Sequence, residues 1–244
     1  LCAAYLDGTL EQKRWAKTNK FKKIDHVIFD LDGLLLGTED IYVDIFSIIC
    51  SKYGKKYTFE VREKVLGTIE KDTSAIIIRE LNLPVTVEEF LDQLHTVQEE
   101  LLPKTPLMPG AERLVRHLHE HGVPIAVATS SSKESIDLKL TNYQELFSLF
   151  LHIVSATSDP EVKRGKPNPD IFLVCASKFP NKPAPEKCLV FEDAPNGVKA
   201  AVAAGMQVVM VPDEHISEEN KKQATMVLRS LEDFKPELFG LPPF

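Results

Sequence analysis

The sequence contains few cysteines, and none of them is paired at a metal-binding or redox spacing. Cys2, Cys50, Cys175 and Cys188 are the only cysteines in 244 residues, and no C-x-x-C segment occurs. Zinc knuckles and dithiol redox sites need closely spaced thiols, so both kinds of site are excluded. Asn-x-Ser/Thr glycosylation acceptors are also absent. We therefore predict reduced thiols in a cytoplasmic protein.

Long apolar runs and an excess of basic residues are missing as well. The uncharged stretch Ala200–Pro212 is shorter than the roughly 18 apolar residues that cross a bilayer, so we predict no membrane span. The chain has 29 basic and 36 acidic residues, for a formal net charge of −7. Nucleic-acid surfaces carry clustered lysine and arginine, so we predict no nucleic-acid partner. With 43% hydrophobic and 27% charged residues, the composition is that of a folded globular protein.

The first 24 residues differ from the rest of the chain. They contain six basic and two acidic residues. We predict a poorly ordered basic tail over residues 1–24. A transit peptide is a weaker interpretation, because such segments contain few acidic residues. Trp15, the only tryptophan, lies in this tail.

Short apolar runs rich in β-branched residues follow the tail. Each ends at turn-forming or charged residues, as buried parallel strands do. The predicted strands are His26–Asp30, Pro124–Thr129, His152–Val154, Cys188–Phe191 and Gln207–Val211, with Thr225–Leu228 as a sixth candidate. Helical patterns lie between them and end at glycines. Alternating strands and helices predict an α/β fold with a Rossmann-like parallel sheet, which binds ligands beyond the carboxyl ends of its strands.

The first two predicted strands are too far apart for a single crossover. Residues 31–123 separate them, whereas a crossover needs about 30 residues. Helices are predicted inside this gap at Glu39–Tyr53, Phe59–Leu66, Thr73–Leu81 and Val87–Leu102. We therefore predict a small α-helical cap domain over residues 38–105 and a core domain made of residues 25–37 and 106–244. The connecting segments Leu34–Thr38 and Lys104–Pro109 lie where hinge closure over a ligand is natural.

Two of the predicted strands end in paired carboxylates. The segment Asp30-Leu31-Asp32-Gly33 follows the first strand, and its glycine permits a sharp turn. Glu192-Asp193 follows the fourth strand in the same way. Alone, the first pair also fits a strand-ending turn and the second a helix cap.

Hydroxyl and lysine side chains follow the other strands. The second strand ends in Thr129-Ser130-Ser131-Ser132, whose hydroxyls and amides are able to hold phosphate oxygens, although a helix cap is the simpler interpretation. Lys166 precedes a proline whose rigidity is able to aim it inward, but a solvated lysine is the default. Because parallel strands share one carboxyl edge, we expect all four segments to meet there.

These four segments, in this order, resemble the motifs of the haloacid dehalogenase superfamily over Val27–Val211, and the helical gap resembles its C1-type cap. Asp30 and Asp32 match the first motif, Thr129 the second, Lys166 the third and Glu192-Asp193 the fourth. Further segments, Leu107–Glu112, Gly205–Asp213 and Lys235–Pro242 among them, resemble the pseudouridine-5′-phosphatase group of that superfamily.

The resemblance implies a Mg²⁺-dependent phosphatase that hydrolyses a small phosphorylated metabolite through an aspartyl-phosphate. Pseudouridine 5′-phosphate or a related nucleotide or sugar phosphate is the implied substrate. Asp30 would be the nucleophile, and Asp32 the general acid and then the base. The implied Mg²⁺ ligands are Asp30, Asp32 through its backbone oxygen, and Asp193, with Glu192 beside them; the implied phosphate-binding residues are Thr129, Ser130 and Lys166.

Two alternative functions stay open at this point. A sugar phosphomutase would use the same aspartyl-phosphate, but such mutases grip a second phosphate with a basic cap residue, and Gly67-Thr68-Ile69-Glu70 contains no arginine. A catalytically weak paralogue that binds ligands is the other alternative. It is supported by Gly37, where this branch usually carries an aspartate, since glycine removes a carboxylate and loosens the first connection. A monomer is the favoured oligomeric state.

Three histidines and a lysine cluster are expected to lie outside the site. His117, His119 and His121 lie on one predicted helix, where we expect them to face solvent rather than to bind a metal. The cluster of Lys52, Lys55 and Lys56 is expected to be a solvated surface.

Overall fold

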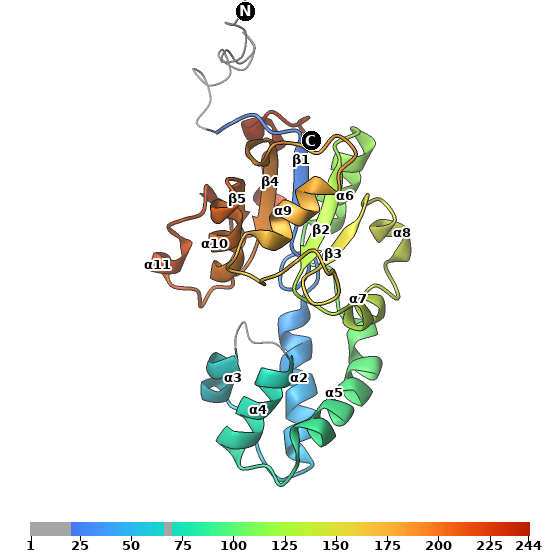
Figure 1. Ribbon diagram of the computed structural model, residues 1–244, viewed down its shortest axis with the longest axis vertical. Helices are drawn as coiled ribbons and strands as arrows, with labels where there is room; N and C mark the ends of the chain where they lie inside the picture. The colour runs from blue at the N-terminus through green and yellow to red at the C-terminus, as the bar shows by residue number, and fades with distance from the viewer. Residues whose placement is uncertain (1–20, 66–69) are drawn as a thin grey trace, which may run out of the picture.

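A six-stranded parallel sheet forms the centre of the computed structural model, which describes residues 21–65 and 70–244 (Figure 1). The strand order is β3-β2-β1-β4-β5-β6, and every neighbouring pair is parallel. The strands are β1 (His26–Phe29), β2 (Ile125–Thr129), β3 (Ile153–Ser155), β4 (Cys188–Glu192), β5 (Gln207–Met210) and β6 (Met226–Val227). The predicted α/β fold is confirmed, and each strand begins and ends within one residue of its predicted bounds.

Helices cover both faces of the sheet because the strands are apolar on both faces. Val27 and Phe29 of β1 pack on one side with residues of α6, whereas Ile28 packs on the other with residues of α9 and α10. The helices outside the long connection are α6 (Ala111–Glu120), α7 (Lys133–Lys139), α8 (Gln144–Phe147), α9 (Asp170–Ser177), α10 (Pro195–Ala203) and α11 (Glu218–Lys221), with 3₁₀ turns η2 (Pro185–Lys187), η3 (Leu231–Asp233) and η4 (Pro236–Phe239). This alternation of buried side chains is the pattern of a doubly covered sheet.

A helical insertion fills the long connection between β1 and β2. It consists of α2 (Thr38–Ser51), α3 (Phe59–Val65), α4 (Glu70–Leu81), α5 (Val87–Leu101) and η1 (Leu102–Lys104). These helices bury an apolar cluster of their own, which includes Ile49, Phe90 and Leu94. Figure 1 shows the insertion below the end of β1, on the opposite side of the sheet from the C-terminus. α4 begins earlier than the predicted Thr73, and the predicted end of α3 at Leu66 lies outside the described residues.

The two connections to the insertion lie side by side. The amide of Gly37 donates to the Pro106 carbonyl at 2.8 Å, and the amide of Met108 donates to the Leu35 carbonyl at 2.9 Å. Leu36 also forms a bridge with Leu107. Backbone hydrogen bonds therefore hold the two predicted hinge segments together at the rim of the sheet.

The last residues assigned to the basic tail belong to the core instead. Ile24 is 2% exposed, and Phe21 stacks on Phe239 with ring centroids 4.6 Å apart. The apolar side chains at these two positions explain the difference, because charge alone described this segment in the sequence. Trp15 and the rest of residues 1–20 lie outside the described residues.

No helix within residues 21–65 and 70–244 is long and apolar enough to span a membrane.

The expectation that His117 faces solvent is wrong. His117 is buried, and its Nε2 atom lies 2.9 Å from the Pro242 carbonyl oxygen. The C-terminal segment folds back over α6, with the Phe244 ring 4.5 Å from the imidazole, and helical periodicity gives no sign of that contact. His119 and His121 are exposed as expected, and so are Lys52, Lys55 and Lys56.

Candidate functional site

The carboxyl ends of three adjacent strands bring the predicted residues together. β1 leads into Asp30, β2 ends at Thr129 and β4 ends at Glu192. β1 pairs with both β2 and β4, so these residues meet at one edge of the sheet. This edge faces the helical insertion, because α2 follows β1 directly (Figure 1).

Three carboxylates form a compact acidic cluster at this edge. Asp30, Glu192 and Asp193 each contribute an oxygen atom, and these atoms lie within 4.8 Å of one another. Asp30 is 6% exposed and Glu192 is 1% exposed. Burial raises the pKa of Asp30 to about 7, with Lys166 opposing and Glu192 adding to the effect. Burial and the neighbouring carboxylates also raise the pKa of Asp193 well above its ordinary value.

Lys166 is buried among these carboxylates rather than solvated. Its Nζ atom donates to Asp30 Oδ1, to Glu192 Oε1 at 2.6 Å and to the Ala128 carbonyl at 3.2 Å. Burial opposes the charged form, but Asp30 and Glu192 outweigh it and raise the lysine pKa. Lys166 was expected near this edge of the sheet, and it lies there. Its partners are Asp30 and Glu192, whose charge it neutralises.

Glu192 has its hydrogen-bonding capacity engaged by its neighbours. Oε1 accepts from Lys166, and Oε2 accepts from the backbone amides of Asp193 and Ala194, each at 3.1 Å. A Cβ atom at Gly197 would lie 1.7 Å from Oε1, so only glycine leaves room for this carboxylate. Glu192 is therefore placed to orient its neighbours.

The acidic cluster fits a hard divalent cation. Two buried carboxylates, Asp30 and Glu192, and the half-buried Asp193 gather beside a single lysine. The negative charge that this leaves is costly in a site largely removed from water. The raised pKa values of Asp30 and Asp193 express that cost. Mg²⁺ prefers carboxylate and carbonyl oxygens, and the cluster offers them.

Asp32 points into a second, separate set of polar side chains. Its Oδ1 atom accepts from Lys139 Nζ at 2.6 Å. Its Oδ2 atom accepts from Ser131 Oγ at 2.7 Å and from Thr129 Oγ1 at 3.3 Å. Burial opposes ionisation of Asp32, but Lys139 and the hydroxyl hydrogen bonds outweigh it and hold the pKa of this carboxyl below its ordinary value.

Two members of this set, Ser131 and Lys139, were missed in the sequence. Ser130, the predicted phosphate-binding serine, is exposed, whereas Ser131 contacts Asp32. The run of three serines after Thr129 indicated this loop, but it did not indicate which serine contacts Asp32. Lys139 is 0% exposed, yet its sequence surroundings resemble those of any lysine at the end of a surface helix. A lysine almost two turns beyond the polar start of a helix was the signal that the sequence offered.

The first turn of α2 faces the same edge of the sheet. Thr38 is 2% exposed, and its side chain helps to lower the pKa of Asp32. The negative charge of Glu39 contributes to the raised pKa of Asp193. Arg62 of α3 donates to Glu39 Oε2 at 2.6 Å. The insertion therefore places polar and charged side chains of its own beside the acidic cluster.

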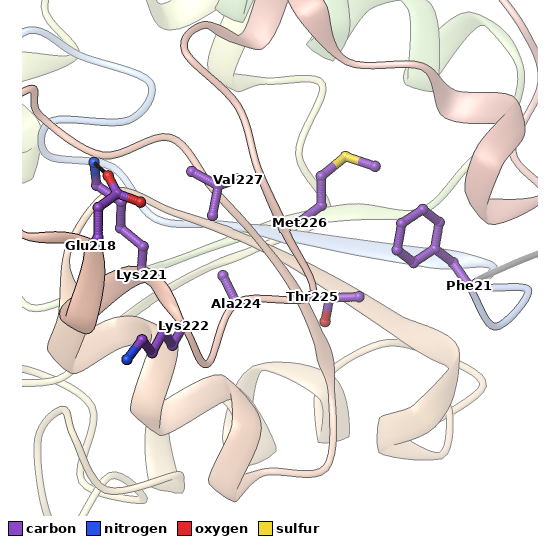
Figure 2. Close-up of a pocket in the computed structure, with 8 residues that line it drawn as sticks. All are labelled: Phe21, Glu218, Lys221, Lys222, Ala224, Thr225, Met226 and Val227. Atoms are coloured by element: carbon purple, nitrogen blue, oxygen red, sulfur yellow. Dashed lines mark hydrogen bonds and ion pairs between the residues drawn. The ribbon is translucent and has the colours of Figure 1, made fainter.

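A separate hollow of about 460 Å³ lies beside β6 (Figure 2). Figure 2 shows Phe21 and Met226 toward one end, and Glu218, Lys221 and Lys222 toward the other. Ala224, Thr225 and Val227 complete the lining. None of these residues belongs to the acidic cluster or to the set around Asp32.

Comparison with known proteins gives consistent matches along most of the chain. Residues 27–211 match the family described as haloacid dehalogenase-like hydrolase. A "Probable pseudouridine-5′-phosphatase" of Drosophila melanogaster is 51% identical over 223 residues, which are 91% of this chain and 96% of that protein. The (DL)-glycerol-3-phosphatase 2 of Arabidopsis thaliana is 45% identical over 91% of this chain and 93% of its own length.

One solved structure extends the comparison to bound ligands. It is a HAD family hydrolase from Deinococcus radiodurans R1 with bound phosphate and sodium. It is 25% identical, covers 91% of this chain and 99% of its own, and superposes with a TM-score of 0.72.

Proposed function

The chain belongs to the haloacid dehalogenase-like hydrolases and is a phosphatase of that family, and we propose that it uses Mg²⁺ and an aspartyl-phosphate on Asp30 to hydrolyse a small phosphomonoester. The observation that carries this proposal is the acidic cluster of Asp30, Glu192 and Asp193 around Lys166. A phosphoryl transfer needs a nucleophile in line with the leaving group, neutralisation of charge and a proton for the leaving oxygen. The residues at this edge are able to meet each need.

In the first step, a carboxylate oxygen of Asp30 attacks phosphorus. The bond between phosphorus and the ester oxygen breaks, and its electron pair stays on that oxygen. Asp32 donates a proton there, which releases a neutral alcohol. Lys139 favours ionised Asp32, and the negative charge of a bound phosphoryl group would raise the pKa of this carboxyl again.

In the second step, the Asp32 carboxylate takes a proton from water. The water oxygen attacks phosphorus, the bond to Asp30 breaks, and inorganic phosphate leaves with Asp30 restored as a carboxylate. Lys166 neutralises charge near Asp30 throughout, since it donates to Asp30 and lies within hydrogen-bonding distance of the Ala128 carbonyl at the end of β2.

Asp30, Asp193 and the backbone oxygen of Asp32 would hold Mg²⁺, with Glu192 and Lys166 as supports. The bound ion would supply neutralisation of the charge on the carboxylates and on the transferring phosphoryl group. Thr129 and Ser130 stay the predicted phosphate-binding residues, together with Lys166. The Thr129 hydroxyl already donates to Asp32 and accepts from the Ser131 amide at 3.1 Å, so phosphate binding would fall largely to backbone amides of this loop.

Pseudouridine 5′-phosphate is the proposed substrate. It is supported by the Drosophila relative, which is named for that activity and matches 91% of this chain. The Arabidopsis relative, named for glycerol-3-phosphate, makes a smaller phosphate ester the main competitor.

A sugar phosphomutase is less well supported. At the position where such enzymes need a basic group, residues 67–69 lie outside the described residues, and Glu70 accepts a hydrogen bond from Gln98 at 2.8 Å. An acidic side chain there repels a second phosphate. A ligand-binding paralogue without activity is also less well supported. Although Gly37 stands where this branch usually has an aspartate, the acidic cluster is compact and Lys166 and Asp32 keep their hydrogen bonds.

The test is a screen of purified protein against pseudouridine 5′-phosphate, glycerol 3-phosphate and glucose 1-phosphate, with Mg²⁺ and with EDTA. We expect release of inorganic phosphate only with Mg²⁺ and the highest kcat/KM on the pseudouridine ester. Isomerisation of the sugar phosphate without phosphate release would favour the mutase instead. No release from any ester would favour the binding protein.

A further inference from the structure

Lys139 is a fully buried lysine. Neither step of the proposed phosphoryl transfer uses it directly. It lies in the last turn of α7, the helix that follows the loop with Thr129 and Ser130, and its side chain is 0% exposed. Burying an ammonium group is costly unless the group is paired and hydrogen-bonded. A lysine in this place therefore needs a partner within the protein, and that partner is Asp32.

Lys139 and Ser131 together hold both oxygens of the Asp32 carboxylate. Lys139 Nζ donates to Asp32 Oδ1 at 2.6 Å and to Ser131 Oγ at 2.7 Å. Ser131 Oγ in turn donates to Asp32 Oδ2 at 2.7 Å. Contact at both oxygens fixes the rotation of the carboxylate as well as its position.

The helical insertion holds Lys139 from the other side. Its ammonium lies 5.2 Å from the centre of the Tyr42 ring in α2. Ser135, one turn earlier on α7, has its hydroxyl 3.4 Å from the Tyr42 hydroxyl. The aliphatic stem of Lys139 is thus enclosed where the sheet edge meets the insertion, so its ammonium has little freedom to move.

The two buried lysines of the site serve different carboxylates. Lys166 pairs with Asp30 and Glu192, whereas Lys139 pairs with Asp32. The residue proposed to attack phosphorus and the residue proposed to move protons therefore each have their own cation. Substitution of Lys139 therefore removes none of the contacts between Lys166, Asp30 and Glu192.

We propose that Lys139 is a positioning residue that holds the Asp32 carboxylate beside Ser131, at the place from which it serves first the leaving oxygen and then water. The inference rests on the proposed function. It predicts a specific defect: loss of Lys139 slows both proton transfers, while substrate binding and attack by Asp30 persist.

The test compares two substrates in the full-length Lys139→Met variant with Mg²⁺. 4-Nitrophenyl phosphate has a leaving group that needs no proton, whereas glycerol 3-phosphate has one that does. On the alkyl ester we expect kcat to fall by about 100-fold or more, the usual size of a general acid–base contribution, with KM changed by less than about threefold.

On 4-nitrophenyl phosphate the variant should show a burst. The first step proceeds without Asp32, the second is slow, and nitrophenolate appears rapidly at up to one equivalent per enzyme before a slow steady rate. The matched control is Lys221→Met, which removes an ion-paired lysine on α11, and it should behave as the wild type on both esters.

An equal loss of kcat on the two esters, without a burst, would overturn the proposal. That result is expected if Lys139 has only a structural role, because the substitution would then lower only the fraction of active enzyme. An unchanged kcat on the alkyl ester would overturn it as well. If the wild-type protein releases phosphate neither from these two esters nor from pseudouridine 5′-phosphate, the proposed function fails, which is a different result from failure of the positioning role.

A second comparison covers the case in which Lys139→Met does not fold. Asp32→Asn and Asp32→Asn/Lys139→Met both lack the Asp32 charge, and the double variant also removes the buried cation. If Lys139 acts through Asp32, the two have the same burst and the same steady rate. A further loss of about tenfold or more in the double variant would contradict the proposal.

Discussion

A Cβ atom added to Gly33 would lie 2.2 Å from Oδ2 of Asp193, far inside the contact distance of non-bonded atoms. Gly33 also has φ +80°, a left-handed conformation that disfavours side chains. The backbone of the turn after β1 therefore packs directly against the Asp193 carboxylate. One glycine sets both the course of the chain after Asp32 and the room for a proposed metal ligand.

Substitution of Gly33 should impair metal binding more than it impairs folding. Gly33→Ala displaces the Asp193 carboxylate, and we expect the Mg²⁺ concentration for half-maximal activity to rise by about tenfold or more. Backbone strain should also lower the free energy of unfolding by about 1–2 kcal/mol. Activity against Mg²⁺ concentration and urea unfolding measure the two effects.

Gly54→Ala is the matched control. Gly54 has φ +66°, and a Cβ atom there meets nothing within 4 Å, so the variant has similar strain without the collision. It should lose stability and keep the wild-type Mg²⁺ requirement. The same Mg²⁺ requirement in both alanine variants would show that Gly33 serves the fold alone.

Mg²⁺ should stabilise the protein more at high pH than at low pH. The pKa values of Asp30 and Asp193 are raised in the fold, so these carboxyls contribute stability when protonated. That contribution is complete below the unfolded value of 3.8 and is lost as the pH rises through about 7, the value for Asp30. In EDTA we therefore expect the melting temperature to fall between about pH 5 and about pH 8, and Mg²⁺ should offset the fall.

Asp193→Asn separates this effect from the titration of the rest of the chain. The variant lacks one of the two shifted carboxyls, so its melting temperature in EDTA should depend less on pH and should respond little to Mg²⁺. A wild-type protein that gains as much from Mg²⁺ at the acidic end as at the alkaline end would contradict the prediction.

Glu192 should act on metal affinity indirectly. Its oxygens accept from Lys166 and from the Asp193 and Ala194 amides, and Glu192→Gln weakens these contacts without removing a ligand. We expect a rise of about tenfold in the Mg²⁺ concentration for half-maximal activity, against about 100-fold or more for Asp193→Asn. Equal effects of the two substitutions would make Glu192 a direct ligand.

The sheet and the acidic edge could be predicted because local patterns determine them. Buried parallel strands are apolar on both faces, and this pattern predicts the starts of β1 at His26 and of β4 at Cys188. The polar residues that end these strands share an edge as a consequence of parallel pairing. Parallel pairing therefore predicts that Asp30 and Asp193 share one site, and the resemblance to the family motifs adds Lys166 to it.

The place of Lys139 in the set around Asp32 could not be predicted, because it depends on tertiary packing. Lys139 is buried only because α7 lies between the sheet and the insertion, where Tyr42 covers it. His117 is buried for a similar reason, since the C-terminal segment returns over α6. Neither contact leaves a trace in spacing or composition, and a lysine or histidine on a helix is exposed by default.

The central claim is that Asp30 carries the phosphoryl group during turnover. Acid quenching of the enzyme during steady-state hydrolysis, followed by mass analysis of its peptides, tests this most directly. We predict the added mass of one phosphoryl group at Asp30 in the wild type, more of it in Asp32→Asn, and none in Asp30→Asn, which should also be inactive. Phosphate release by Asp30→Asn at the wild-type rate, or a phosphoryl group on another residue, would contradict the account.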